Sequence, residues 1–210
     1  MSGRAFPDAK ASSATHDPSI PHIPPSVLDP TEFYLRGRVQ GDVVAQWKGQ
    51  DIYNWERLDL ATPYALDLDH ILEKQCFTYA LSQLNLRKED DDFALAAVVL
   101  RESVVNEPNN LALTLSSTNR IKGTGVYKFL DDARTGHRDK TFTRYLSAKR
   151  DGESLNRVVT GRITRNMGIS MKKCQRKLSD EGDTPVLEKL SGQLQKLYVE
   201  MELNRSAKSP

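Results

Sequence analysis

The sequence predicts an α+β fold that is mostly helical, with one pair of short strands embedded among the helices. Apolar residues recur at helical spacing over residues 72–84 and 90–105. The segments YALDLDHIL (64–72) and LALTL (111–115) are typical of short strands, because apolar positions alternate or follow a turn cluster. The first 30 residues hold six prolines among small and polar residues, and this composition predicts a disordered leader.

The length of 210 residues fits one medium domain with tails. We expect residues 31–135 to form the core, with a helical insert at 72–105, and residues 136–205 to form a basic helical extension. Near the start of this core, Gly37 and Gly41 interrupt both helical and strand patterns, so the choice between them stays open. Ser116 or Ser117 is expected to cap the helix that follows the second strand. Further helices are predicted at 125–133, 140–150, 153–167 and 185–201.

The charge is distributed unevenly although the net charge is only +2. Residues 1–110 hold 10 Lys and Arg against 17 Asp and Glu, whereas residues 111–210 hold 20 against 11. The region 118–178 is the most basic, with 16 against 5. Such a block suits a polyanion such as nucleic acid; the alternative is a solvated helical surface.

Several classes of protein are excluded by the sequence. It has no run of 18 apolar residues that would span a membrane and no apolar stretch of a signal peptide. Cys76 and Cys174 lie far apart, which excludes a disulfide framework and a four-cysteine zinc site. We therefore expect an intracellular protein, in the cytoplasm or the nucleus, that is neither secreted nor membrane-bound. Phosphate-loop, dinucleotide-binding and serine-hydrolase motifs are also absent.

The last predicted helix carries an apolar stripe at steps of three and four residues. Its members are Leu187, Leu190, Leu194, Leu197 and Met201. Such a stripe either docks the helix on its own domain or pairs two chains, so the leucines are a possible dimer contact.

Two segments together carry the chemistry. The first strand ends in Asp69-His70-Ile71, and after an insert the second strand begins at Asn110-Leu111. A helix then places Asn119 and Lys122 three residues apart. This order of residues resembles the HNH family of ββα-metal (His-Me finger) nucleases, in an H-N-N variant. The resemblance covers about residues 64–130, and the nine-residue interval from Asn110 to Asn119 agrees with the family.

The resemblance implies a small ββα-metal finger that cleaves phosphodiester bonds. Asp69 and Asn119 would supply oxygen ligands to one Mg²⁺ or Mn²⁺ ion. His70 would act as the general base that takes a proton from water, and Asn110 would orient its ring. Arg120 and Lys122 would hold neighbouring phosphates.

The sequence also departs from the family pattern. Glu73 stands where many members have proline, the interval from His70 to Asn110 is 40 residues, and the family's zinc-binding cysteine pairs are absent. A decayed nuclease that only binds nucleic acid is therefore an alternative. Asp67 lies on the same strand face as Asp69. It could hold the metal ligands in place, replace one of them or be a solvated acid. Glu73 could be an additional ligand of the metal.

The favoured function is a metal-dependent endonuclease that acts on DNA rather than RNA, on family precedent. The alternatives are a non-enzymatic basic helical nucleic-acid-binding or coat protein, and a protein–protein module. Trp47 and Trp55 are expected in the core rather than as stacking platforms for bases. Basic side chains beyond the motif would contact the phosphates of nucleic acid, namely Arg134, Arg138, Lys140, Arg144, Arg157, Arg162 and Arg165.

Overall fold

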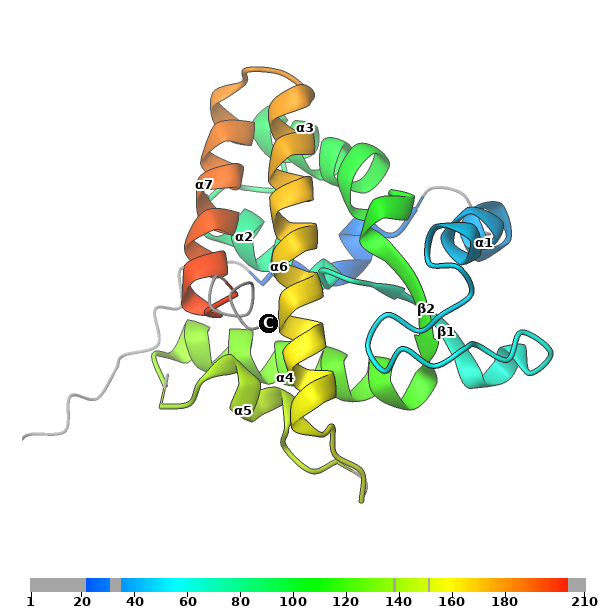
Figure 1. Ribbon diagram of the computed structural model, residues 1–210. Coiled ribbons are helices and arrows are strands. Elements are labelled where there is room, and N and C mark those ends of the chain that lie inside the picture. The colour runs from blue at the N-terminus through cyan, green and yellow to red at the C-terminus, as the bar shows by residue number, and fades with distance from the viewer. Residues whose placement is uncertain (1–21, 31–34, 138, 151, 204–210) are drawn as a thin grey trace, which may run out of the picture.

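A two-stranded antiparallel sheet lies among the helices (Figure 1). The structure is a computed structural model that describes residues 22–30, 35–137, 139–150 and 152–203. Strand β1 (Leu66–His70) pairs with β2 (Leu111–Leu115), and helix α4 (Ser116–Thr135) follows β2 directly. The predicted strands and the mostly helical α+β fold are confirmed.

The two faces of this sheet have different neighbours, because side chains alternate along a strand. Helix α1 (Leu35–Gln46) packs Val39 and Val43 against Leu111 and Leu113 on one face. The segment around Gly37 and Gly41, for which the sequence did not decide between helix and strand, is therefore a helix. The other face carries Asp67 and Asp69 opposite Thr114 and Ala112, and this is the face with which α4 makes its polar contacts.

The insert between the strands is helical, as predicted. It contains α2 (Lys74–Ser82), α3 (Asp91–Val99), a π-helical stretch (Leu100–Val105) and a 3-10 turn (Pro108–Asn110). Its two ends meet, because the backbone N–H of Ile71 donates to the carbonyl of Asn110 at 2.8 Å. The insert therefore leaves and rejoins the sheet at one point.

The remaining helices are α5 (Phe142–Leu146), α6 (Arg157–Asp180) and α7 (Pro185–Glu200). Helices α6 and α7 lie side by side and are joined by a short turn (Figure 1). Asn156 caps α6, because its side-chain oxygen accepts a hydrogen bond from the backbone N–H of Val159. Buried residues of α5, α6 and α7 belong to the same core cluster as those of α2, α3 and α4.

The structure corrects the predicted leader and the predicted start of the helix after β2. Ile23 and Leu28 are buried in the core, so the folded part begins before residue 31; residues 1–21 of the leader lie outside the described residues. Helix α4 runs without a break to Thr135, and neither serine caps it. Instead, the hydroxyl of Ser116 donates to Asp67 at 2.8 Å.

The apolar stripe of α7 docks this helix on its own domain, the first of the two alternatives. Leu187, Leu190, Leu194 and Leu197 are buried within the chain's own core, where α7 packs against α2 and α6. None of the described helices combines the length and the apolar character needed to cross a bilayer.

Candidate functional site

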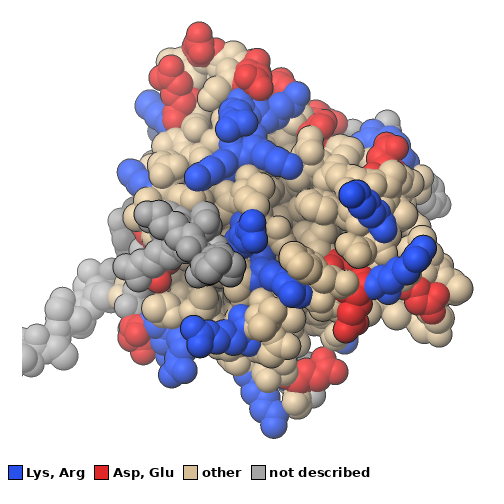
Figure 2. Space-filling view, in the orientation of Figure 1, with Lys and Arg blue, Asp and Glu red and all other residues tan. Residues whose placement is uncertain are grey.

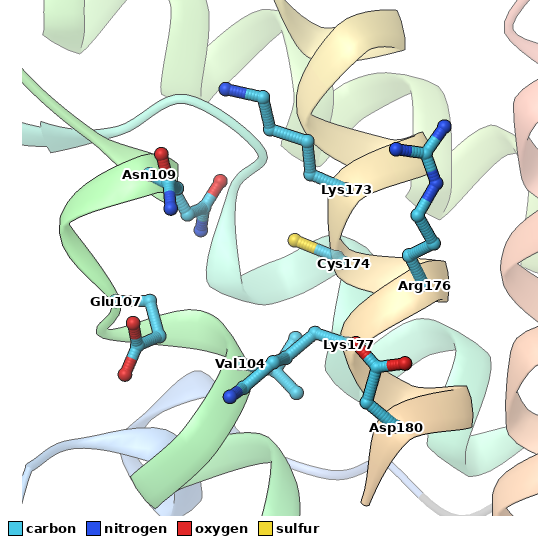
Figure 3. Close-up of a pocket in the computed structure, with 9 residues that line it drawn as sticks. Val104, Glu107, Asn109, Lys173, Cys174, Arg176, Lys177 and Asp180 are labelled. Atoms are coloured by element: carbon cyan, nitrogen blue, oxygen red, sulfur yellow. The ribbon is translucent and has the colours of Figure 1, made fainter.

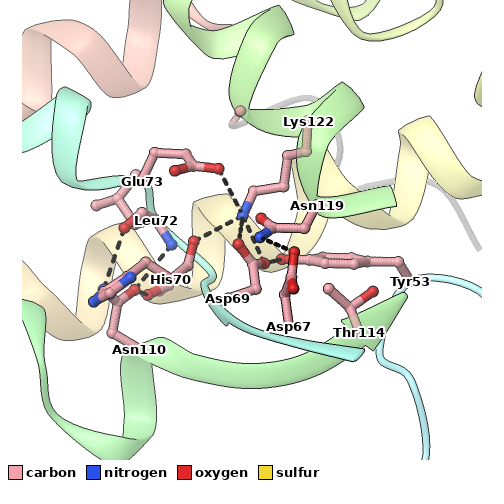
Figure 4. Close-up of polar contacts among 12 residues, drawn as sticks. Tyr53, Asp67, Asp69, His70, Leu72, Glu73, Asn110, Thr114, Asn119 and Lys122 are labelled. Carbon is pink, nitrogen blue, oxygen red and sulfur yellow. Dashed lines mark hydrogen bonds and ion pairs between the residues drawn. The ribbon is translucent and has the colours of Figure 1, made fainter. Parts of the chain in front are cut away.

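A buried ammonium group occupies the point where β1 and α4 meet. Lys122 of α4 is 0 % exposed, and its Nζ lies 2.6 Å from both carboxylate oxygens of Asp69 on β1 (Figure 4). The same Nζ donates to the backbone carbonyl of His70 at 2.7 Å and lies 3.1 Å from Oε1 of Glu73. Two carboxylates and one carbonyl thus surround a single cation.

Burial and charge act against each other in this cluster. Burial raises the pKa of Asp69 and of Glu73 above the usual value for a carboxyl group, although the charge of Lys122 opposes this shift. Burial alone would lower the pKa of Lys122, but the two carboxylates outweigh it and raise that pKa. Lys122 is therefore charged at neutral pH.

Tyr53 completes the surroundings of Asp69. Its hydroxyl donates to Oδ2 of Asp69 at 2.6 Å, and Lys122 Nζ lies 5.5 Å from the centre of its ring. The backbone N–H of Tyr53 donates to the carboxylate of Asp51, which also accepts from the hydroxyl of Thr114 at 2.6 Å. Sequence reasoning missed Tyr53 and Asp51, because they lie in an irregular segment whose contacts with the strands are distant in sequence.

The two predicted metal ligands have different partners. Asn119 donates from Nδ2 to Oδ2 of Asp67 at 3.1 Å, whereas Asp69 is bonded to Lys122 and Tyr53. Asp67 is therefore held between Ser116 and Asn119 of α4 and is not a freely solvated acid. The strand, the helix and the order of residues are as expected, but Asn119 and Asp69 do not share a hydrogen-bond partner.

His70 points to the other face of the strand. Its Nε2 lies 3.0 Å from Oδ1 of Asn106 at the end of the π-helical stretch. Burial is the main reason that its pKa falls to about 4, with further lowering by the charges of Lys74 and Lys122. The imidazole is therefore neutral at neutral pH and can accept a proton. Asn106 was missed by sequence reasoning, and its only signal was its place at the start of the turn cluster NEPNN.

Asn110 acts on the backbone that follows His70. Its Oδ1 accepts from the N–H of Leu72 at 2.9 Å and from the hydroxyl of Ser170 at 2.6 Å. Its Nδ2 donates to the carbonyl oxygens of Leu72 and Val105. Asn110 thus fixes the chain beyond His70 rather than bonding the imidazole itself.

The basic residues predicted to contact nucleic acid fall into different environments. Lys122 is buried in the ion cluster, which corrects its prediction as an exposed phosphate contact. Arg120 and Arg144 are exposed, whereas the guanidinium of Arg134 lies over the ring of Tyr79 at 5.3 Å. Lys140 lies near Asp139 and over Tyr145, and Arg138 lies outside the described residues.

Comparison of the chain with protein-family models, with curated proteins and with solved structures finds no match. Function is therefore inferred from the residues of the site and from the charge of the surface.

Proposed function

We propose that the chain is a metal-dependent endonuclease that hydrolyses phosphodiester bonds of nucleic acid, with DNA as the favoured substrate. The observation that carries the proposal is the convergence of oxygen atoms from Asp69, Glu73 and the His70 carbonyl on one cation position. These atoms lie at the junction of strand and helix where the order of residues predicts the active site.

The donor set is suited to a divalent ion. Carboxylate and carbonyl oxygens are the ligands that Mg²⁺ and Mn²⁺ prefer. Oε1 of Glu73 is buried and lies 3.1 Å from Nζ of Lys122, in an ion pair without hydrogen-bond geometry. Asp69 and Glu73 would hold the ion, with Asn119 on the adjacent turn of α4 as a further ligand. A bound divalent ion would polarise the scissile phosphate and stabilise the leaving oxygen.

The residues around this position have distinct roles in the proposal. In the proposal, His70 accepts the proton of the attacking water. Its imidazole is neutral at neutral pH, although it leaves β1 on the face opposite Asp69 and its lowered pKa makes it a weaker base. Asn106 bonds one ring nitrogen and so fixes the plane of the imidazole. Asn110 holds the following backbone. Lys122 occupies the cation position, so its ammonium would have to leave Asp69 before a divalent ion could bind there.

We place this activity inside the cell, in the cytoplasm or the nucleus. Cys76 and Cys174 are both free thiols buried in the core, and burial raises the pKa of each thiol. Free buried thiols are typical of proteins in reducing compartments.

A second candidate function is binding of nucleic acid without cleavage. It is favoured because the ion cluster is shielded from solvent and already holds a lysine as counter-ion. Asp69 is 2 % exposed, and Lys122 supplies its counter-charge. In that case the ion cluster only holds β1 to α4, and the basic surface alone carries the function.

Plasmid nicking distinguishes the two candidates. Purified protein is incubated with supercoiled DNA in Mg²⁺, in Mn²⁺ and in EDTA, beside His70→Ala and the matched control His137→Ala, whose side chain is exposed. The endonuclease proposal expects metal-dependent nicking that His70→Ala abolishes and His137→Ala retains. Circular dichroism verifies that both variants are folded, and His70→Gln replaces His70→Ala if it is not.

Absence of nicking in both metals, or nicking that His70→Ala leaves unchanged, would overturn the endonuclease proposal. Retained binding of DNA in the same preparations would then favour the second candidate.

A further inference from the structure

We infer that one face of α6 forms a binding track for single-stranded nucleic acid, with Trp55 as a stacking platform for a base. The inference takes from the proposed function only that the partner is a nucleic acid, because the track lies outside the ion cluster. Its residues on α6 recur every three or four positions and so share one face of the helix. They are Arg162, Arg165, Asn166, Ile169, Lys173 and Arg176.

Two hollows lie along this face of α6. One, of about 320 Å³, lies between Arg162, Arg165 and the segment that carries Trp47 and Trp55. The other, of about 300 Å³, lies between Lys173, Arg176 and Asn109 near the end of the insert (Figure 3). From residue 162 to residue 176 the helix rises about 21 Å, so the two hollows can contact different nucleotides of one strand.

Trp55 is the unusual residue of the first hollow. Its side chain is 64 % exposed, which corrects the expectation that it lies in the core. The guanidinium of Arg162 lies over its ring at 4.4 Å and also donates to the carbonyl of Tyr53 at 3.2 Å. A large exposed indole held by an arginine presents a flat surface to solvent, and bases stack on such surfaces.

The backbone holds Trp55 in this exposed position. Its φ is +66°, in the left-handed region that residues other than glycine seldom adopt. The conformation is fixed by the bond from the Trp55 N–H to the carbonyl of Asp51 at 2.8 Å. Asp51 in turn is anchored to β2 through Thr114 and the N–H of Leu115. The strained residue is therefore supported from the sheet rather than left to a free loop.

The cations of the track are available to phosphate groups. Arg165, Lys173 and Arg176 are exposed, and none of them forms an ion pair with a carboxylate of the residues that the structure describes. Figure 2 shows Lys and Arg side chains down the middle of the face where Figure 1 places α6. The acidic residues that line the two hollows are Glu107, Asp180 and the buried Asp51, and they are fewer than the basic residues that line them.

A single strand fits this arrangement better than a duplex. In a duplex the bases are already stacked on one another and present only their edges in the grooves. An exposed indole beside exposed cations instead suits unstacked bases and a neighbouring phosphate backbone. DNA and RNA strands share both features, so the two are compared directly in the test.

The test measures binding by the full-length chain in EDTA, where cleavage does not contribute. Fluorescence anisotropy is recorded with labelled dT20, U20 and a 20-base-pair duplex at several salt concentrations. We expect Trp55→Ala to weaken binding of a single strand by about tenfold, in the range seen for loss of one base–aromatic stack. The matched control is Tyr64→Ala, because Tyr64 is also an exposed aromatic residue.

A second pair of variants tests the cations. The double variant Arg165→Ala/Lys173→Ala should reduce the slope of log K against log salt by roughly 1.4, about 0.7 for each phosphate that the variant no longer neutralises. Lys189→Ala/Lys196→Ala, on the exposed side of α7, removes the same charge elsewhere and should leave the slope unchanged. Preference for dT20 or for U20 identifies which strand the track takes.

Equal effects of Trp55→Ala and Tyr64→Ala, or tighter binding of the duplex than of both single strands, would overturn the inference. Failure of nicking with retained, Trp55-dependent binding would overturn the endonuclease proposal alone. Nicking without dependence of binding on Trp55 would overturn the track alone.

Discussion

Lys122 is the residue on which the candidate site depends. A completely buried ammonium group needs nearby negative charge, and Asp69 and Glu73 supply it. Removing the ammonium leaves two carboxylates in a space without a counter-ion. Lys122 therefore both occupies the cation position and stabilises the carboxylates around it.

We predict that Lys122→Ala lowers the free energy of unfolding by about 3–5 kcal/mol, the cost of leaving a buried charge without its partner. Lys128→Ala, an exposed lysine on the same helix, should change it by less than about 0.5 kcal/mol. Urea denaturation in EDTA measures both. Adding Mg²⁺ or Mn²⁺ should then raise the midpoint of Lys122→Ala more than that of the wild type; equal costs for the two variants would contradict the buried ion cluster.

The pKa of His70 gives the pH dependence of stability a definite sign. Because the folded pKa is about 4 and the unfolded value about 6.5, the unfolded state binds the proton more readily between these values. His70 therefore contributes stability above pH 6.5 that is lost as the pH falls toward 4.

At pH 5 this loss amounts to about 2 kcal/mol relative to pH 7. His70→Gln cannot titrate, so urea denaturation in EDTA should show a smaller decrease for the variant than for the wild type over this interval. The comparison cancels the pH dependence of the carboxylates that both proteins share. Identical decreases in the two proteins would show that His70 is not held neutral.

At the scale of elements, α4 and α5 approach closely at a glycine. A Cβ on Gly125 would lie 3.0 Å from Cδ2 of Leu146 and 3.2 Å from the carbonyl oxygen of Tyr145. The backbone of α5 cannot shift as easily as the tip of a side chain. Gly125 is therefore required by packing, although glycine weakens a helix interior.

We predict that Gly125→Ala destabilises the fold by about 1–2 kcal/mol, because the clash exceeds the gain in helix propensity. Gly161→Ala, in α6 with nothing within 4 Å of the added Cβ, should stabilise it by about 0.5–1 kcal/mol. Thermal unfolding of the two variants gives opposite shifts in Tm. Shifts of the same sign would show that α4 and α5 are not in close contact.

The elements were largely predictable from the sequence, and the contacts that join them were not. The alternation of Leu66 to Asp69 and the turn before Leu111 indicated both strands, because local spacing determines which face is buried. Residues Asp51, Tyr53 and Asn106 were missed, since their partners lie far along the chain and no local pattern marks them. Trp55 was assigned to the core because the sequence shows that the residue is a large aromatic one but does not show its backbone conformation.

At the scale of the whole molecule, one large core cluster joins residues from both halves of the described chain. Leu194 of α7 is fully buried in the cluster that also contains Leu28, Phe77 and Leu130. Residues from both ends of the described chain thus support one another. Loss of a core side chain of α7 should therefore also destabilise the packing of Leu28 near the start of the described chain.

We predict that Leu194→Ala costs about 2–5 kcal/mol and shifts two probes of unfolding equally. Fluorescence reports Trp47 and Trp55 in the N-terminal half, and far-ultraviolet circular dichroism reports the helices of the C-terminal half as well. Coincident transitions in wild type and variant are expected for two-state unfolding. A helical transition at lower urea than the fluorescence transition would show that residues 136–205 fold as a separate unit.

The meeting of the two ends of the insert has a consequence for the order of folding. His70 and Leu111 are neighbours in the sheet, yet 40 residues separate them along the chain, so their pairing has a high contact order and a large entropy of loop closure. The pair α6–α7 and the pair α4–α5 need only short connections and can form earlier. The ion cluster, which requires both strands and α4, is therefore expected among the last features to assemble, so a partly folded chain would carry the basic helices without the site that they accompany.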